Sequence, residues 1–301
     1  MKSNTYLALE EFSKIDSIDE TIADINFILE GFTHVIQSIY DEKPTLGEGE
    51  VFTETLSIKI LLATKSIIQI CNGVSLNAPN KVSSVKWLDF SSVNILVRSM
   101  IEAFLTLEYL YYNDLQESER TFRFYIWRIS GYKSRQSFFD RRSIESNIQH
   151  KLDSELCEIN DLLQKVESSI HYKDLNKQNL WKLDKYGLPR LNSWLDLLEN
   201  SILNTSHFSI SYKLYSNYAH SEFISLIQMN TATGQCKGSE ANNLSVRTAL
   251  VTVKMLNCVA ITLLKNKFDC TREAYDCLDS KLKEKIEFWH EFATSDISVA
   301  K

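Results

Sequence analysis

Apolar residues recur at helical spacing along most of the chain. An apolar residue every three or four positions predicts an amphipathic α-helix. Nine segments have this pattern, at about 17–40, 51–71, 91–113, 116–142, 143–168, 189–203, 209–229, 244–267 and 269–292. Only 3 Pro and 8 Gly interrupt 301 residues, as expected for helices, which need few turn residues. The pattern therefore predicts an all-α, bundle-like fold of about nine helices.

The segment Ser91–Asn113 is the most apolar of the nine, and we expect its part Leu96–Tyr112 to be the central helix of the fold. It carries apolar side chains in almost every direction, and a helix that is apolar all round is usually buried. Arg98 and Glu102 lie one turn apart on one face of this helix. Buried charges persist only when they are paired and hydrogen-bonded. The sequence therefore predicts an ion pair inside the core.

No internal repeat or break in composition divides the chain, so we expect one helical domain over residues 1–301. Its ends, 1–15 and 293–301, are expected to be flexible. The longest irregular segment is Ser169–Gly187. No run of about 18 uncharged apolar residues predicts a membrane-spanning helix, and the first residues lack the pattern of a secretion signal. These features predict a cytoplasmic protein without a membrane partner.

A second polar constellation lies in the segment 209–229. Tyr212, Ser216 and His220 are spaced four by four, so they share one helix face, which Phe223 and Ile227 continue. We expect the Arg98–Glu102 pair to be the partner of this face. An imidazole exchanges a proton near neutral pH and suits general acid–base work, and an arginine stabilises a phosphate or an oxyanion. The alternative is a polar network that only fixes the register of the helices.

The stretch Arg120–Arg142 combines basic and aromatic residues. It holds six arginines and Lys133 against the single acid Asp140. Arg128, Arg135 and Arg142 recur every seven residues and share one face. These three arginines and Lys133 are the candidate nucleic-acid-binding residues, because arginine holds phosphates and aromatic rings stack on bases. The alternative is an amphipathic helix whose basic face is solvated or meets an acidic neighbour.

Several function classes lack their signatures here. The sequence has no Gly-rich phosphate loop, no dinucleotide fingerprint and no Gly-x-Ser-x-Gly elbow. Its six histidines are scattered, without a partner at metal-ligand spacing, so no metal and no cofactor are expected. A formal charge of −6 argues against a surface that coats nucleic acid but permits a local basic site.

Two short motifs resemble a bacterial all-helical domain family of unknown function, which is distantly similar to the HEPN helical bundles. They are Arg-x-x-x-Glu within Val97–Ala103 and Tyr-x-x-x-Ser-x-x-x-His-Ser within Tyr212–Ser221, and the resemblance covers about 95–230. HEPN proteins are often metal-independent ribonucleases of toxin, CRISPR-associated and phage-defence systems, with an arginine shortly before a histidine. Tyr215 stands where that arginine is expected, so Arg98 would supply the charge from another helix.

The resemblance implies a bacterial effector that acts on RNA or binds it. The catalytic residues of such a metal-independent ribonuclease would be His220, Arg98, Glu102, Tyr212 and Ser216. RNA and a partner protein are the expected partners, and the resemblance implies a homodimer. Two alternatives stay open: a non-catalytic binding or scaffold protein with a structural polar centre, and a sensor of a small anionic ligand. An effector requires a His220 that is accessible from a cleft, and a buried His220 sealed by Phe223 and Ile227 would count heavily against it.

Overall fold

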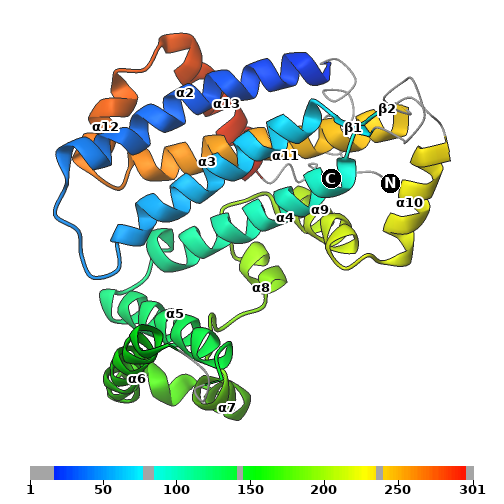
Figure 1. Cartoon of the computed structure of the whole chain (residues 1–301). Coiled ribbons are helices and arrows are strands. Elements are labelled where there is room, and N and C mark those ends of the chain that lie inside the picture. Colours follow the sequence, from blue (N-terminus) through cyan, green and yellow to red (C-terminus); the bar gives the residue numbers. More distant parts are fainter. Residues whose placement is uncertain (1–16, 77–84, 141–144, 235–239, 296–301) are drawn as a thin grey trace, which may run out of the picture. The chain divides into compact units, whose positions relative to one another are not determined.

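Figure 1 shows the computed structural model of the chain, which describes residues 17–76, 85–140, 145–234 and 240–295. The described residues form twelve α-helices, one π-helix, one 3-10 helix and two three-residue strands. The predicted all-α fold is confirmed. The helices outnumber the predicted nine because one forms inside Ser169–Gly187, and because the segments 209–229 and 269–292 each form two.

The contacts within the chain gather in two compact units, where the sequence predicts one domain. The main unit contains residues 1–107 and 197–301, and the inserted unit contains residues 108–196. Neither boundary coincides with a loop rich in proline or glycine, so the composition does not mark them.

The main unit is built around α11 (Glu240–Lys265), which packs against α2, α3, α4, α12 and α13. Every side chain of α11 from Val251 to Ile261 is buried. The other elements of this unit are α2 (Ile18–Glu42), α3 (Val51–Cys71), β1 (Val74–Leu76), β2 (Val85–Trp87), α4 (Phe90–Leu107), α9 (Thr205–Ala219), α10 (Phe223–Gly234), α12 (Asp269–Asp276) and α13 (Ser280–Thr294). The short helix α8 (Trp194–Glu199) crosses from the inserted unit into the main unit.

The most buried helix is thus α11, and the prediction that Leu96–Tyr112 is the centre of the fold is wrong. By length and composition alone, Phe90–Tyr112 and Leu244–Lys265 could each cross a membrane. The most apolar window of the first is 56% buried inside the protein and that of the second 78%. Because buried core helices pass the same test, this is only a weak indication of a membrane segment.

Hydrogen bonds fix the first and last described residues of the main unit. At the start of α2 the Ser17 hydroxyl accepts from the Glu20 amide at 3.1 Å, and the Glu20 carboxylate accepts from the Ser17 amide at 2.8 Å. This is a capping box, which satisfies amides that the first turn leaves unpaired. At the other end Ala293 is buried, and its carbonyl accepts from the Asn204 amide. Residues 1–15 and 296–301 lie outside the described residues.

The inserted unit contains η1 (Glu108–Tyr112), α5 (Glu117–Ser137), α6 (Ser146–Glu167), η2 (Ile170–Asp174) and α7 (Lys177–Lys185). Its core is formed by Phe122, Ile126, Ile129, Ile159, Leu162, Val166, Leu183 and Leu188. Gly187 has a φ of +87°, and a Cβ there would lie 2.5 Å from the Ser130 Cα. Only glycine therefore lets the chain leave α7 this close to α5.

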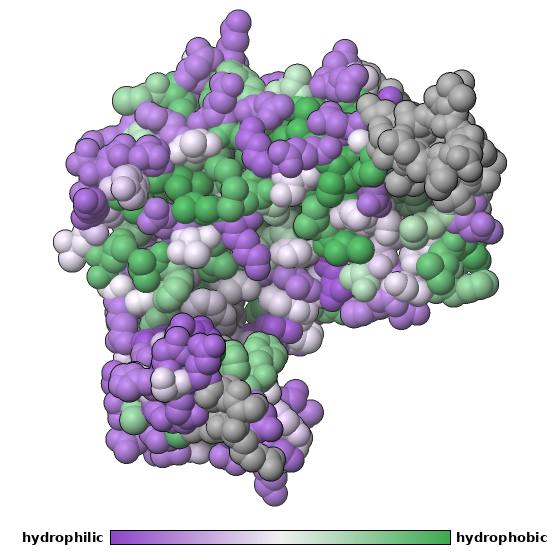
Figure 2. Space-filling model, viewed as in Figure 1, coloured by the Kyte–Doolittle hydropathy of each residue, from purple (hydrophilic) through white to green (hydrophobic). Residues whose placement is uncertain are grey.

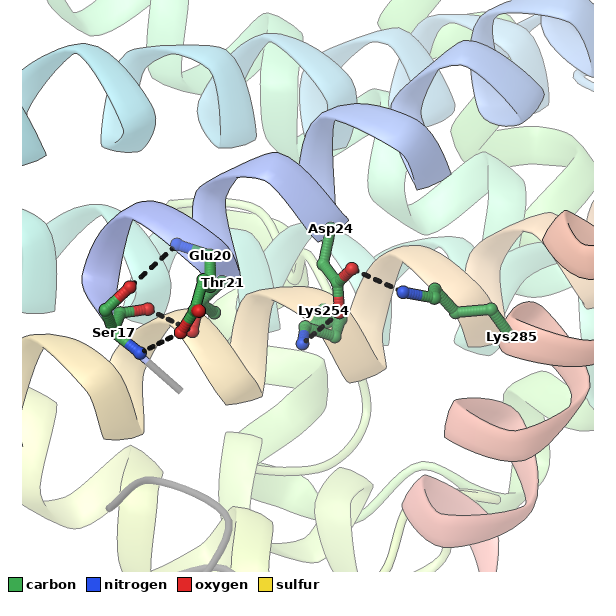
Figure 3. A network of polar contacts seen from close by, with 6 residues as sticks. All are labelled: Ser17, Glu20, Thr21, Asp24, Lys254 and Lys285. Carbon is green, nitrogen blue, oxygen red and sulfur yellow. Dashed lines mark hydrogen bonds and ion pairs between the residues drawn. The ribbon is translucent and has the colours of Figure 1, made fainter. Parts of the chain in front are cut away.

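A partly buried group of ion pairs joins three helices of the main unit, as Figure 3 shows. The Lys254 side chain on α11 is only 1% exposed, and its Nζ lies 3.2 Å from the Asp24 carboxylate on α2. Lys285 on α13 contacts the same carboxylate. Burial by itself would raise the pKa of Asp24, but the hydrogen bonds and charges of Lys285 and Lys254 bring that pKa below its ordinary value. Asp24 therefore stays ionised and neutralises Lys254.

Replacing Asp24 tests how much this carboxylate contributes to the fold. We expect Asp24→Ala to lower the free energy of unfolding by about 3 kcal/mol, because it leaves a buried ammonium without its partner. Urea denaturation at pH 7 measures the change. The matched control is Glu30→Ala, which removes an exposed carboxylate from the same helix. Equal stability of the two variants would contradict a stabilising role of the ion pair.

A second buried polar group is His207 on α9. Its Nε2 lies 3.2 Å from the Thr252 hydroxyl of α11 and 3.4 Å from the Ser211 hydroxyl. Burial lowers the pKa of His207 to about 4. The ring is therefore neutral in the folded protein and serves as a hydrogen-bonding core residue.

This burial predicts a pH dependence of stability. An unfolded histidine has a pKa of about 6.5, so between pH 6.5 and 4 the unfolded chain binds a proton that the folded chain does not. The free energy of unfolding should fall by up to about 3 kcal/mol as the pH is lowered through this interval. Urea titrations at a series of pH values should show this decrease for wild type and His34→Gln, an exposed control, and a smaller one for His207→Gln. A decrease of the same size in all three would contradict the assignment.

Candidate functional site

The packing of α4 against α9 brings the two predicted polar faces together. Arg98 and Glu102 come from α4, and Tyr212 comes from α9. His220 follows the last residue of α9, where its amide donates to the Ser216 carbonyl. Ser221 has a φ of 53°, a left-handed conformation that ends the helix before α10 begins. The candidate site is therefore held by two helices and a tight turn.

Arg98 contacts three other polar side chains of the site, Glu102, His220 and Tyr212. Its Nη2 lies 3.3 Å from Glu102 Oε1, and its Nη1 lies 3.3 Å from His220 Nε2. The Tyr212 hydroxyl donates to the same Glu102 oxygen at 2.9 Å. The guanidinium carbon also lies 5.4 Å from the centre of the Tyr212 ring, within range of a cation–π interaction. The predicted meeting of the two polar faces is confirmed, while the roles of these residues remain predictions.

The site opens to solvent, which corrects the prediction of charges inside the core. The Arg98 and Glu102 side chains are 18% and 27% exposed. His220 is exposed, and it is not sealed by its apolar neighbours, because Phe223 is 74% exposed and Ile227 is exposed as well. Most apolar side chains of α4 are buried, whereas the face that carries Ile95 and Arg98 lies at the surface of the main unit. The charges thus keep part of their hydration.

The contacts define which atoms carry protons. A guanidinium only donates hydrogen bonds, so His220 Nε2 accepts from Arg98 and the proton of the neutral ring lies on Nδ1. Burial raises the pKa of Tyr212, and the Glu102 carboxylate raises it further against the opposing effect of Arg98. Tyr212 therefore keeps its proton and acts as a donor. Ser216 donates to the Tyr212 carbonyl at 2.7 Å, which satisfies its hydroxyl hydrogen within α9.

Part of the hydrogen-bonding capacity of the site is not used within the described part of the chain. Arg98 Nε is shielded from solvent and has no hydrogen-bond acceptor among the described residues. With Nε2 accepting from Arg98, the exposed His220 ring still offers its Nδ1–H as a donor. Within the described part of the chain, no group of three or more His, Cys, Asp or Glu side chains could hold a metal ion.

One polar residue beside the site is absent from the sequence-based set. Asn94 lies one turn before Arg98 on α4 and is fully buried. Its Nδ2 is 3.4 Å from the Ser245 hydroxyl of α11, and its Oδ1 has no donor among the described residues. The spacing of four from Arg98 and of eight from Glu102 is the signal that could have identified it.

The basic face of α5 is used within the inserted unit. Arg128 forms an ion pair with Glu158 of α6, and Arg135 Nη1 lies 2.8 Å from Glu155 Oε1. Lys133 donates to the Leu183 carbonyl at 2.8 Å and to the Asp184 carbonyl. Burial lowers the pKa of Lys133, while Asp184 opposes this effect. The structure thus agrees with a basic face that meets an acidic neighbour. Arg142 lies outside the described residues.

Removing the tyrosine hydroxyl tests the coupling between the two helices. We expect Tyr212→Phe to lower the free energy of unfolding by about 1 kcal/mol, because Glu102 loses a partly buried hydrogen bond. Urea denaturation measures the loss, with the exposed Tyr40→Phe on α2 as the matched control. If Tyr212→Phe is as stable as Tyr40→Phe, the hydroxyl contributes nothing to the packing of α4 on α9.

Comparison with known proteins identifies a family for this chain. Neither the curated proteins nor the solved structures contain a match to this sequence. A family model matches residues 58–235, from within α3 to the residue after α10. This range includes the five candidate site residues and covers more than half of the 301 residues. The chain therefore belongs to DUF5677, a family of unknown function.

Proposed function

We propose that this protein is an RNA-directed effector that uses Arg98 and His220 to cleave phosphodiester bonds without a metal ion. The observation that carries the proposal is the contact between an exposed histidine and an arginine at 3.3 Å. General acid–base catalysis needs an imidazole that substrate can reach, and the developing charge on a phosphate needs a fixed cation. Both groups stand side by side at the surface of the main unit.

The proposed reaction assigns a separate task to each residue. When a phosphate binds, the Arg98 guanidinium turns its Nη1 from His220 toward the phosphate oxygens. His220 Nε2 then accepts the proton of the attacking hydroxyl, and the electron pair of that O–H bond forms the new bond to phosphorus. The proton passes to the leaving oxygen as its bond to phosphorus breaks. Glu102 and Tyr212 are positioning residues, because they hold Arg98 from the other side.

RNA as the substrate rests on the resemblance of the two motifs to HEPN bundles. That resemblance also implies the biological setting, a bacterial toxin or phage-defence system in the cytoplasm, and a homodimer. The proposal does not require Arg128, Arg135 or Lys133 to contact RNA, because each already has a partner within the inserted unit.

A second candidate is a non-catalytic protein whose polar centre only fixes helix register. It is favoured by hydrogen bonds among the polar groups of the site, since Glu102 accepts from both Arg98 and Tyr212. Such networks rigidify a fold without any chemistry. In a sensor of a small anion, the same site would bind phosphate without turnover.

An RNA cleavage assay distinguishes the proposed ribonuclease from the non-catalytic candidates. Purified wild type, incubated with a mixed RNA pool in the presence of EDTA, should degrade RNA. We expect His220→Ala and Arg98→Ala each to lower the rate by at least about 100-fold, because each removes a group that acts in the transition state. The matched control is His34→Ala, which removes an exposed histidine of α2 and should leave the rate unchanged.

Folding of each variant is checked by circular dichroism and thermal melting. His220→Ala should melt close to wild type because the ring is exposed. A wild-type protein that leaves RNA intact, or a folded His220→Ala that cuts as fast as wild type, would overturn the proposed activity. An inert wild type together with a strongly destabilised Arg98→Ala would favour the structural candidate.

A further inference from the structure

Two large aromatic side chains of the inserted unit are exposed, one in the middle of α7 and one directly after its last residue. Trp181 is 52% exposed and Tyr186 is 58% exposed. Their ring centroids are 5.4 Å apart with an interplanar angle of 75°, so the rings meet edge to face. Neighbouring exposed aromatics on a folded surface commonly mark a binding site.

The exposure follows from how α7 is anchored. Leu183 points into the core of the inserted unit, and Asn176 caps the helix by accepting from the Asn179 amide at 2.8 Å. Lys177, Trp181 and Lys185 are spaced four by four, so they lie on one face. All three are exposed. The tryptophan thus stands on the outer face of the helix, one turn from a lysine on each side.

The segment that carries these rings has a net positive charge, although the chain as a whole carries −6. Residues 170–186 contain four lysines against two aspartates. The Lys185 Nζ lies 5.4 Å from the centre of the Trp181 ring and 5.3 Å from that of the Tyr186 ring. The ammonium is therefore held beside the aromatic faces.

We propose that the face formed by Lys177, Trp181, Lys185 and Tyr186 binds single-stranded RNA. Lysines neutralise backbone phosphates, and an aromatic ring stacks on any base, so such a face binds a strand with little sequence preference. RNA rather than DNA as the occupant rests on the proposed function of the Arg98–His220 site. The inference adds a contact that does not depend on the ion-paired arginines of α5.

A protein partner fits this face less well. Tryptophan and tyrosine are common in the energetic centres of protein interfaces, but lysine is depleted there. Here a lysine lies one turn away on each side of the tryptophan, and one of them contacts both rings. This arrangement complements an anionic polymer with stacking bases.

Binding is measured on the full chain with the substitution His220→Ala, so that the RNA stays intact. Fluorescence polarisation follows a labelled oligouridylate of about 12 nucleotides, within the usual range for such sites. We expect a further Trp181→Ala to weaken binding about tenfold, because one stacked base is lost. The matched control is Phe138→Ala, which removes another exposed aromatic from the inserted unit and should leave binding unchanged.

The lysines are tested by salt dependence. Replacing Lys177 and Lys185 together by alanine should reduce the slope of log Kd against log salt by about 1.4, since each phosphate contact in a single strand contributes about 0.7. Trp181→Ala should leave that slope unchanged. The proposal is overturned if Trp181→Ala leaves the affinity for the oligouridylate unchanged. It is also overturned if the His220→Ala protein does not bind the oligouridylate at all. Equal affinity for oligodeoxythymidylate overturns RNA as the specific occupant.

These outcomes are independent of cleavage. A protein that binds the oligonucleotide through Trp181 but cuts no RNA supports this face and contradicts the proposed activity. A protein that cuts RNA, but whose affinity for RNA is unchanged by Trp181→Ala, supports the proposed activity and contradicts this face.

Discussion

Burial of α11 on all sides between Val251 and Ile261 is the constraint on which the main unit depends. A helix without an exposed side must satisfy each of its polar side chains inside the protein. Thr252 bonds to His207 of α9, Lys254 pairs with Asp24 of α2, and Asn257 donates to Thr64 of α3 at 2.9 Å. Each buried polar residue of α11 thus connects it to a different helix. The apolar contacts hold these helices together, and the polar contacts fix their register.

The candidate site follows from this arrangement because α9 has two polar faces with different partners. His207, Ser211 and Tyr215 lie on one face, where His207 and Tyr215 contact Thr252 of α11. Tyr212 and His220 lie on another, which meets α4. The contacts to α11 hold the helix in place, and the other face carries its tyrosine and histidine to Arg98. A buried structural histidine and an exposed candidate catalytic histidine therefore belong to the same segment of the chain.

The inserted unit distributes its charged residues differently. Arg128 and Arg135 of α5 form ion pairs with α6, whereas Lys177 and Lys185 of α7 remain at the surface, on the helix face of Trp181. A charge that is already paired with a carboxylate gains little from a phosphate, while an exposed lysine releases counterions when it binds one. The shorter and less basic helix is for this reason the better candidate for contact with RNA.

Local patterns in the sequence determined the helices, the capping box of Ser17 and Glu20, and the two polar faces that contain Arg98 and His220. These features depend on residues within a few positions of one another, so periodicity predicts them. The tertiary structure alone decided that Arg98 lies at the surface, that Arg128 and Arg135 pair with α6, that Trp181 is exposed, and that two units form. Each of these depends on which distant segments pack together. Helical spacing shows which residues share a face but not what that face will meet.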